Sequence, residues 1–153
     1  MMEKTFSKTL SANDVGATGG HQAGILIPKT ENDLLGILPP LDSQVKNPDA
    51  WLDCVDENDV VRRFRFIYYN NKLHDPKGTR NEYRITHMTG YFKEAVAREG
   101  DFFEISKIEN ENKYRIRIVR KKLEYAHSVI EDSSPKYENV IRIKIKSSWR
   151  RIH

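Results

Sequence analysis

Three charged side chains at alternate positions, Arg80, Glu82 and Arg84, have the types and spacing needed to read base pairs. On an extended chain they project from one face at intervals of about 6.6 Å, close to twice the rise of about 3.4 Å between stacked base pairs. Arginine makes a bidentate contact to O6 and N7 of guanine, and a carboxylate accepts from N4 of cytosine. We call these three residues the comb, and we expect it to suit G·C pairs in the major groove. The alternative is an exposed strand whose salt bridges contribute little to the stability of the fold.

A second candidate is the glycine-rich polar loop 11–24, which runs directly into the apolar strand 25–27. It holds four of the chain's eight glycines, and glycine lets a backbone adopt positive φ or approach a ligand closely. Several of its side chains can form directional hydrogen bonds, namely Asn13, Asp14, Thr18, His21 and Gln22. The loop is therefore predicted to hold a polar ligand. It matches neither nucleotide signature, because no lysine or helix follows the glycines and the pattern G-x-G-x-x-G is missing.

Metal and hydrolytic chemistry are not favoured. The five histidines lie too far apart for a local metal pair, and the single Cys54 excludes thiolate clusters and disulfides within the chain. Cys54 is predicted to be a small buried apolar residue. A nuclease site built from Asp49, Glu104 and Lys107 is also disfavoured, because residues three apart on a strand point to opposite faces.

Seven strands and two short helices are predicted to position these residues. The strands are expected at 25–27, 51–55, 63–69, 79–85, 102–108, 114–120 and 140–146, with Phe64, Phe66 and Tyr68 facing the core. One helix is expected over 30–38 with Thr30 as its cap. The other is expected over 91–98, with Val96 on its apolar face and Glu94 paired with Arg98. Segment 70–78 is predicted to be an exposed loop. Because strands dominate and helices do not alternate with them, the fold class is mainly β (β-rich α+β), an open barrel.

Length and charge indicate one soluble DNA- or RNA-binding domain. A chain of 153 residues with 38% hydrophobic and 31% charged residues is expected to form a single domain, 1–153. The sequence shows no spanning helix or signal peptide, so an intracellular location is expected. Residues 113–153 hold 12 Lys and Arg against 4 Asp and Glu, and residues 62–84 hold seven basic residues against two acidic ones. Such blocks favour a polyanion, nucleic acid before membrane, although a solvated basic face remains the alternative.

Three blocks of sequence resemble one known family. They are Leu10 to Gly24 (LSANDVGATGGHQAG), Ile67 to Asn70 (IYYN), and Thr79 to Glu82 (TRNE) followed by Arg84 to Thr86 (RIT). In this order they are similar to the N-terminal effector-binding domains of EcoRII-type restriction endonucleases. The resemblance covers residues 10–86, and the remainder fits only the strand pattern.

The resemblance implies a B3-like DNA-binding pseudobarrel whose two projections enter the major groove like a wrench. It places an N-arm at about 11–22 and a C-arm at about 77–84, and it implies a five-base-pair site with CC at one end and GG at the other. The implied base readers are Asp14, His21, Arg80, Glu82 and Arg84. The implied secondary DNA contacts are Ser11, Asn13, Thr18, Gly19, Gly20, Gln22, Lys77, Thr79, Asn81 and Tyr83, and the expected phosphate contacts are Lys72, Arg115 and Arg117.

The chain departs from the family pattern beside the comb. Lys77-Gly78 occurs where the family pattern has Gly-Lys. Tyr83 occupies a position where a basic residue is expected, and His87-Met88 occupies the positions where Arg-Trp is expected. These differences leave two possibilities for the central base pair, A/T only or any base.

The implied function is recognition of double-stranded DNA by part of a bacterial, cytoplasmic type II restriction endonuclease. The chain shows no complete catalytic site, so a fused or associated nuclease domain is expected to cut. No cofactor is expected in this domain, and Mg²⁺ only in the nuclease domain. The alternatives are a B3-type transcriptional regulator, a small autonomous Mg²⁺-dependent nuclease using Asp49 and Glu104, and a single-stranded nucleic-acid binder.

Overall fold

The computed structural model describes residues 4–16, 24–121 and 148–153. Its strands are β1 (Thr5–Thr9), β2 (Ile25–Ile27), β3 (Asp49–Val55), β4 (Val61–Tyr69), β5 (Glu82–Thr86), β6 (Phe102–Lys107), β7 (Lys113–Val119) and β8 (Trp149–Arg151). Its helices are α1 (Asn32–Ile37), α2 (Asn71–His74) and α3 (Thr89–Glu94). Among the described residues, no helix is long and apolar enough to cross a membrane.

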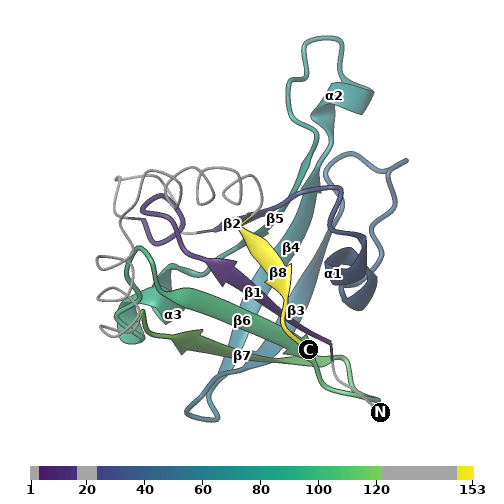
Figure 1. Cartoon of the computed structure of the whole chain (residues 1–153). Helices are drawn as coiled ribbons and strands as arrows, with labels where there is room; N and C mark the ends of the chain where they lie inside the picture. Colours follow the sequence, from purple (N-terminus) through teal and green to yellow (C-terminus); the bar gives the residue numbers. More distant parts are fainter. Residues whose placement is uncertain (1–3, 17–23, 122–147) are drawn as a thin grey trace, which may run out of the picture.

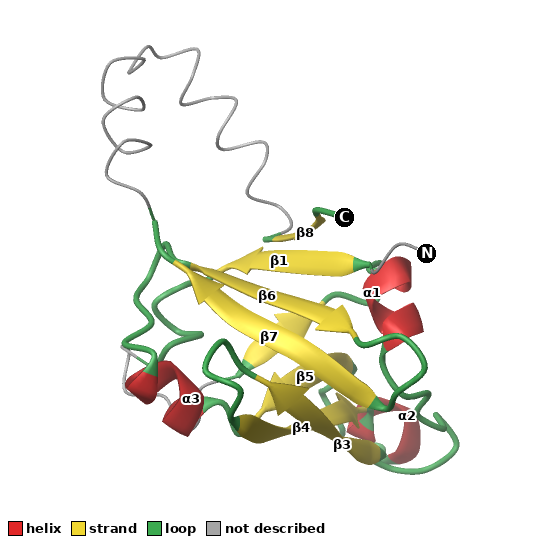
Figure 2. Cartoon of the chain, turned by 90° about the horizontal axis from the view of Figure 1, so that it is seen from below, coloured by secondary structure: helices red, strands yellow, loops and turns green. Residues whose placement is uncertain are grey.

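One eight-stranded sheet, in the order β2-β5-β4-β3-β7-β6-β1-β8, curls into the barrel. Figure 2 shows β1, β6 and β7 lying over β3, β4 and β5, with α3 at one end of the two layers. The edge strands β2 and β8 meet through a side chain, because the indole Nε1 of Trp149 donates to the Leu26 carbonyl at 2.9 Å. A side-chain contact thus joins the two ends of the sheet, as expected for a pseudobarrel.

The core forms between the layers from residues that alternate along the strands. Phe64, Phe66 and Tyr68 are buried as predicted, whereas Arg63 on the opposite face is exposed. Cys54 is fully buried, and burial raises the pKa of its thiol. The period of two therefore assigned the inner face of β4 correctly.

Several boundaries differ from the prediction. β1 and β8 were not predicted, because their pairing with β6 and with each other is a long-range property. β5 begins at Glu82 rather than at 79, because residues 79–81 belong to the connection from β4, where backbone bonds run to α2. α2 forms within the predicted loop 70–78, and it buries none of its residues. The predicted strand 140–146 lies outside the described residues.

The two predicted helices are shorter than expected. α1 has Glu31 rather than Thr30 at its N-cap position. α3 ends at Glu94, and Val96 is exposed with a φ of 52° instead of lying on an apolar helical face. Glu94 pairs with Arg62 of β4 rather than with Arg98, because the helix ends before Arg98 could come one turn below it.

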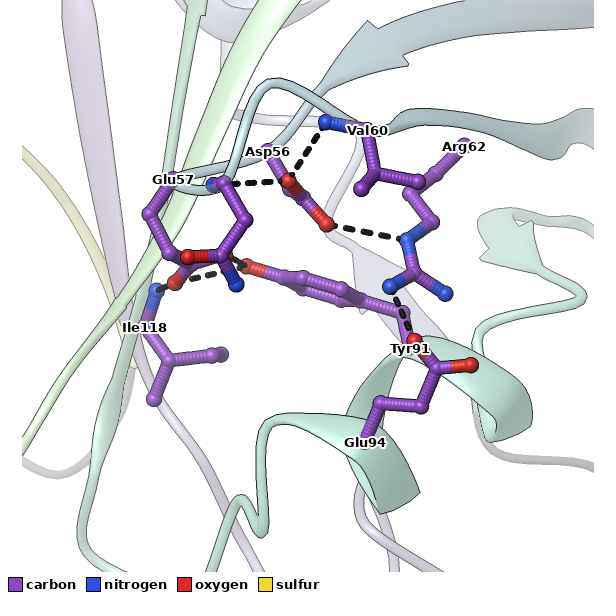
Figure 3. Close-up of polar contacts among 8 residues, drawn as sticks. Asp56, Glu57, Val60, Arg62, Tyr91, Glu94 and Ile118 are labelled. Atoms are coloured by element: carbon purple, nitrogen blue, oxygen red, sulfur yellow. Dashed lines mark hydrogen bonds and ion pairs between the residues drawn. The ribbon is translucent and has the colours of Figure 1, made fainter.

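A polar cluster ties the turn between β3 and β4 to α3 and β7 (Figure 3). The hydroxyl of Tyr91 on α3 donates to the carboxylate of Glu57 at 3.0 Å. The same carboxylate accepts the backbone N–H of Ile118 on β7 at 2.8 Å. The cluster thereby joins the turn at the start of β4 to the helix that follows β5.

Asp56 is the buried anion of this cluster, with 2% of its surface exposed. Burial alone would raise its pKa, but hydrogen bonds from the backbone N–H groups of Val60 and Asn58 and from Arg62 hold the pKa below its usual value. Its carboxylate therefore stays ionised in the folded protein at moderately acidic pH.

Asp56→Asn is expected to lower the free energy of unfolding by about 1–3 kcal/mol at pH 7, because it removes charge from three hydrogen bonds. A lowered folded-state pKa stabilises above about pH 4–5, and that contribution disappears as the pH falls through the folded pKa. Urea unfolding at pH 7 and pH 3 measures the effect. The gap between wild type and variant should shrink at pH 3, and a constant gap would contradict this assignment.

Candidate nucleic-acid interface

The described ends of the two predicted arms lie at opposite ends of β5. The N-arm leads into β2, whose Ile25 pairs with Ile85 near the end of β5. The connection from β4 enters β5 at its other end, Glu82. Figure 1 shows α2 on this connection, projecting beyond the barrel. β5 therefore runs from the C-arm, which carries the comb, to the place where the N-arm rejoins the sheet.

The comb residues lie on one face, as the alternation predicted. Nε of Arg84 donates to Oε2 of Glu82 at 2.5 Å, and Nε of Arg80 lies 3.4 Å from Oε1 of the same carboxylate. The guanidinium of Arg80 also stacks over the ring of Tyr69, 3.6 Å from its centroid. Tyr69 lies opposite Glu82 in the β4–β5 register, so these side chains share a face.

The comb residues remain partly exposed although they form ion pairs with one another. The side chains of Arg80, Glu82 and Arg84 are 40%, 28% and 28% exposed. Burial tends to raise the pKa of Glu82, but Arg84 and then Arg80 outweigh it and lower that pKa. The result is an alternating positive, negative, positive row in which the Glu82 carboxylate is ionised at neutral pH. The salt bridges of the alternative interpretation are therefore present, and they leave all three side chains partly exposed.

Asn81 and Tyr83 occupy the opposite face of this segment. The carboxamide oxygen of Asn81 accepts a hydrogen bond from the hydroxyl of Tyr68, and the Tyr83 ring stacks on Tyr68 with centroids 4.3 Å apart. Tyr83 also stacks on Phe66 at 5.7 Å. These contacts give the segment a packed inner side, and Asn81 lies away from the comb as an ideal strand predicts.

The connection from β4 holds Arg80 although that residue precedes β5. The backbone N–H of Arg80 donates to Oδ1 of Asn71 at 2.8 Å, and the backbone N–H of Lys72 donates to the Arg80 carbonyl at 3.0 Å. Gly78 is required here, because a Cβ at this position would overlap the Asn71 carbonyl and lie 2.7 Å from the Lys72 nitrogen. Backbone contacts therefore fix the position of the first comb residue.

In the described part of the N-arm, Asp14 is buried rather than projecting. Its Oδ2 lies 2.5 Å from Nζ of Lys8 and accepts the backbone N–H of Ser11 at 2.9 Å. The backbone N–H of Asp14 in turn donates to Oγ of Ser11 at 3.1 Å. Only 6% of Asp14 is exposed, so its carboxylate is engaged at the base of the arm. Ser11 and Asn13 are exposed beside it.

The N-arm returns to the sheet through a close approach. A Cβ on Gly24 would lie 2.9 Å from the Ile85 carbonyl, so only glycine fits against β5 without a shift. Five predicted contacts lie outside the described residues: Thr18, Gly19, Gly20, His21 and Gln22.

The predicted phosphate contacts lie in two separate places. Lys72 is exposed on α2, near the exposed Lys77 and Thr79 of the C-arm. Arg115 and Arg117 are exposed on β7, which β4 and β3 separate from β5. Arg117 is paired with Glu104 at 2.7 Å. Lys72 is thus the predicted phosphate contact nearest the comb in the chain.

The residues of the alternative hydrolytic site are engaged elsewhere. Asp49 on β3 pairs with Arg65 at 2.6 Å, and Glu104 pairs with Arg117 on β7. In the described ranges there is no group of three or more His, Cys, Asp or Glu that could hold a metal ion.

Sequence reasoning missed three features beside the comb. The first is Tyr69, on which Arg80 stacks. The second is Leu26, which is 39% exposed and lies opposite Arg84 in the β2–β5 register. The third is the segment 42–48, which is bonded to Asn70 at the start of the β4–β5 connection. The first two features depend on strand pairing. The third depends on bonds between residues 23 apart in the sequence, which no local pattern identifies.

Comparison with known proteins gives concordant results. A family model described as "Restriction endonuclease EcoRII, N-terminal" matches residues 2–99. The type II restriction enzyme EcoRII of Escherichia coli is 42% identical over 93 residues, covering 53% of this chain and 20% of that protein. Among solved structures, the Arabidopsis FUS3–DNA complex matches with a TM-score of 0.54 and 19% identity, covering 76% of this chain and 96% of that one. This last likeness shows the fold, a B3-like pseudobarrel, which the sequence predicted with about seven strands and two helices.

Proposed function

This chain belongs to the family of EcoRII N-terminal domains, and from that premise we propose that it recognises a short sequence in double-stranded DNA. The proposed site has CC at one end and GG at the other, with a central base pair that is A/T only or any base. The chain spans one-fifth of the length of the Escherichia coli enzyme. That the complete protein cuts DNA as a restriction endonuclease is therefore also a proposal.

The comb carries this proposal. Two guanidinium groups and one carboxylate share an accessible face, in the order that suits guanine, cytosine and guanine edges. Stacking on Tyr69 and bonding to Glu82 restrict Arg80 to few rotamers. A reader held in place before binding loses less conformational entropy on binding.

The length of β5 supports a five-base-pair site. Its five residues span four steps of about 3.4 Å, roughly 14 Å. Five stacked base pairs also span four steps of about 3.4 Å. The distance between the point where the β4–β5 connection enters β5 and the point where β2 pairs with its far end is therefore about the length of such a site.

The two arms receive different roles in this proposal. Arg80, Glu82 and Arg84 of the C-arm read bases directly, and His21 reads them from the N-arm. The carboxylate of Asp14 already contacts Lys8 and Ser11, so we assign Asp14 to holding the base of the N-arm rather than to reading.

The wider context is proposed from the family. A fused or associated nuclease domain supplies Mg²⁺-dependent cutting, and this domain needs no cofactor of its own. The proposed location is the bacterial cytoplasm, where a restriction enzyme binds its target DNA.

Selection of bound duplexes from a random pool tests the function. We expect enrichment of a five-base-pair CC/GG site, and a flat result would contradict the proposal. Incubation with Mg²⁺ and a plasmid bearing the selected site tests the alternative nuclease. The expected result is binding without cutting, and specific cutting would favour a nuclease within this chain.

Single comb substitutions should relax specificity. Arg84→Ala and Glu82→Ala are each expected to lose about 1–3 kcal/mol of binding free energy on the selected site and to weaken the preference at one base pair. Lys72→Ala is expected to weaken binding to all sequences alike, because phosphate contacts carry no direct sequence information. Titration of specific and scrambled duplexes at one salt concentration measures both effects. Equal losses on the two duplexes for every comb variant would remove the comb's assigned role.

A further inference from the structure

A buried asparagine joins the segment between α1 and β3 to the start of the β4–β5 connection. Asn70 follows β4 directly and is fully buried. A buried carboxamide needs partners, because an unpaired buried polar group costs free energy. The hydrogen-bond partners of this side chain in the described residues lie in segment 42–48, which we call the brace.

Four hydrogen bonds link Asn70 to the brace. The backbone N–H of Asn47 donates to Oδ1 of Asn70 at 2.7 Å, and the backbone N–H of Asn70 donates to Oδ1 of Asn47 at 3.1 Å. Nδ2 of Asn70 donates to the carbonyls of Ser43 and Val45 at 3.3 and 2.8 Å. Two segments more than twenty residues apart in sequence are thereby held in one register.

The brace continues along α2. Nζ of Lys46 pairs with Asp75 at 2.6 Å, and Nε2 of His74 lies 2.9 Å from the Ser43 carbonyl. These contacts are exposed and contribute little energy singly. Because α2 buries none of its residues, packing against the core does not fix its position. The brace therefore holds the start of the β4–β5 connection, residues 70–75, against the body of the domain.

A short chain of bonds leads from Asn70 to the comb. Its neighbour Asn71 accepts the backbone N–H of Arg80 through Oδ1 at 2.8 Å. Arg80 in turn contacts Glu82, which holds Arg84. A shift of Asn70 would thus be passed to the first comb residue through one peptide bond and one hydrogen bond.

We propose that Asn70 and the brace are positioning elements that set the direction in which the comb meets its base pairs. This proposal rests on the proposed DNA-binding function. It assigns a part in sequence discrimination to residues outside the proposed base and phosphate contacts.

Two variants and one control test the positioning role. Asn47→Gly removes the acceptor for Asn70 and keeps the positive φ of 49°, which glycine adopts freely. Asn70→Ser shortens the buried side chain. Gln44→Ala, at an exposed position of the same brace, is the matched control. The measurement is the ratio of dissociation constants for the selected CC/GG duplex and a scrambled duplex, together with the melting temperature.

The expected result is a ratio about 10-fold smaller for both variants, with a change of less than about 2-fold on the scrambled duplex, and no change for Gln44→Ala. If Asn70→Ser fails to fold, Asn47→Gly decides the question. An unchanged ratio with a lowered melting temperature would show a purely structural role and overturn the inference, leaving the proposed function in place. A wild-type protein that prefers neither duplex would overturn the proposed function and the positioning role together.

Discussion

Replacing Asp14 with alanine is expected to lower the free energy of unfolding by about 3–5 kcal/mol. The change leaves the ammonium of Lys8 buried without its carboxylate, and the side chains of Lys8 and Asp14 are only 7% and 9% exposed. It also removes the acceptor for the Ser11 backbone N–H. Urea unfolding followed by circular dichroism measures the loss.

A double variant provides the control for this prediction. Lys8→Met removes the buried charge, so Lys8→Met combined with Asp14→Ala should recover part of the stability lost by Asp14→Ala alone. DNA titration of the same proteins separates the two roles considered for Asp14. If Asp14→Ala kept wild-type stability but lost preference for the CC/GG duplex, Asp14 would be a base reader and its buried pairing would be contradicted.

Local patterns predicted the features that depend on local geometry. The shared face of Arg80, Glu82 and Arg84 follows from a period of two, and this period holds even though Arg80 precedes β5. The burial of Phe64 and Phe66 follows from the same alternation. Such features need only the direction of side chains along an extended chain.

Features that depend on pairing across the chain could not be predicted. The partner of Asp14 is Lys8, six residues away, whereas the sequence predicted an external polar ligand for this loop. The bonds between Asn47 and Asn70 bridge 23 residues, so the sequence placed Asn70 only in an exposed loop and indicated neither its burial nor its partner. Strands β1 and β8 pair with each other from the two ends of the chain. Polar residues in loops therefore indicated that hydrogen bonds exist, and the structure was needed to identify their partners.

Gly78→Ala is expected to abolish most sequence discrimination while leaving the barrel folded. The added Cβ would overlap the Asn71 carbonyl and approach the Lys72 nitrogen, the two residues whose hydrogen bonds hold Arg80. The backbone must shift, because neither contact is with a flexible side chain. Displacement of the comb should cost about 2–6 kcal/mol of discrimination, the equivalent of two base contacts.

Stability should change much less than specificity in this variant. α2 buries none of its residues, so the core does not depend on the connection that moves, and about 1–3 kcal/mol of unfolding free energy is the expected loss. Gly36→Ala is the control, since Gly36 lies at an exposed position of α1 and an added Cβ there meets nothing within 4 Å. The measurements are the melting temperature and the dissociation constants for CC/GG and scrambled duplexes. A Gly78→Ala protein that kept its wild-type preference would show that recognition does not depend on where the β4–β5 connection places Arg80, because this substitution displaces that connection and spares the rest of the sheet.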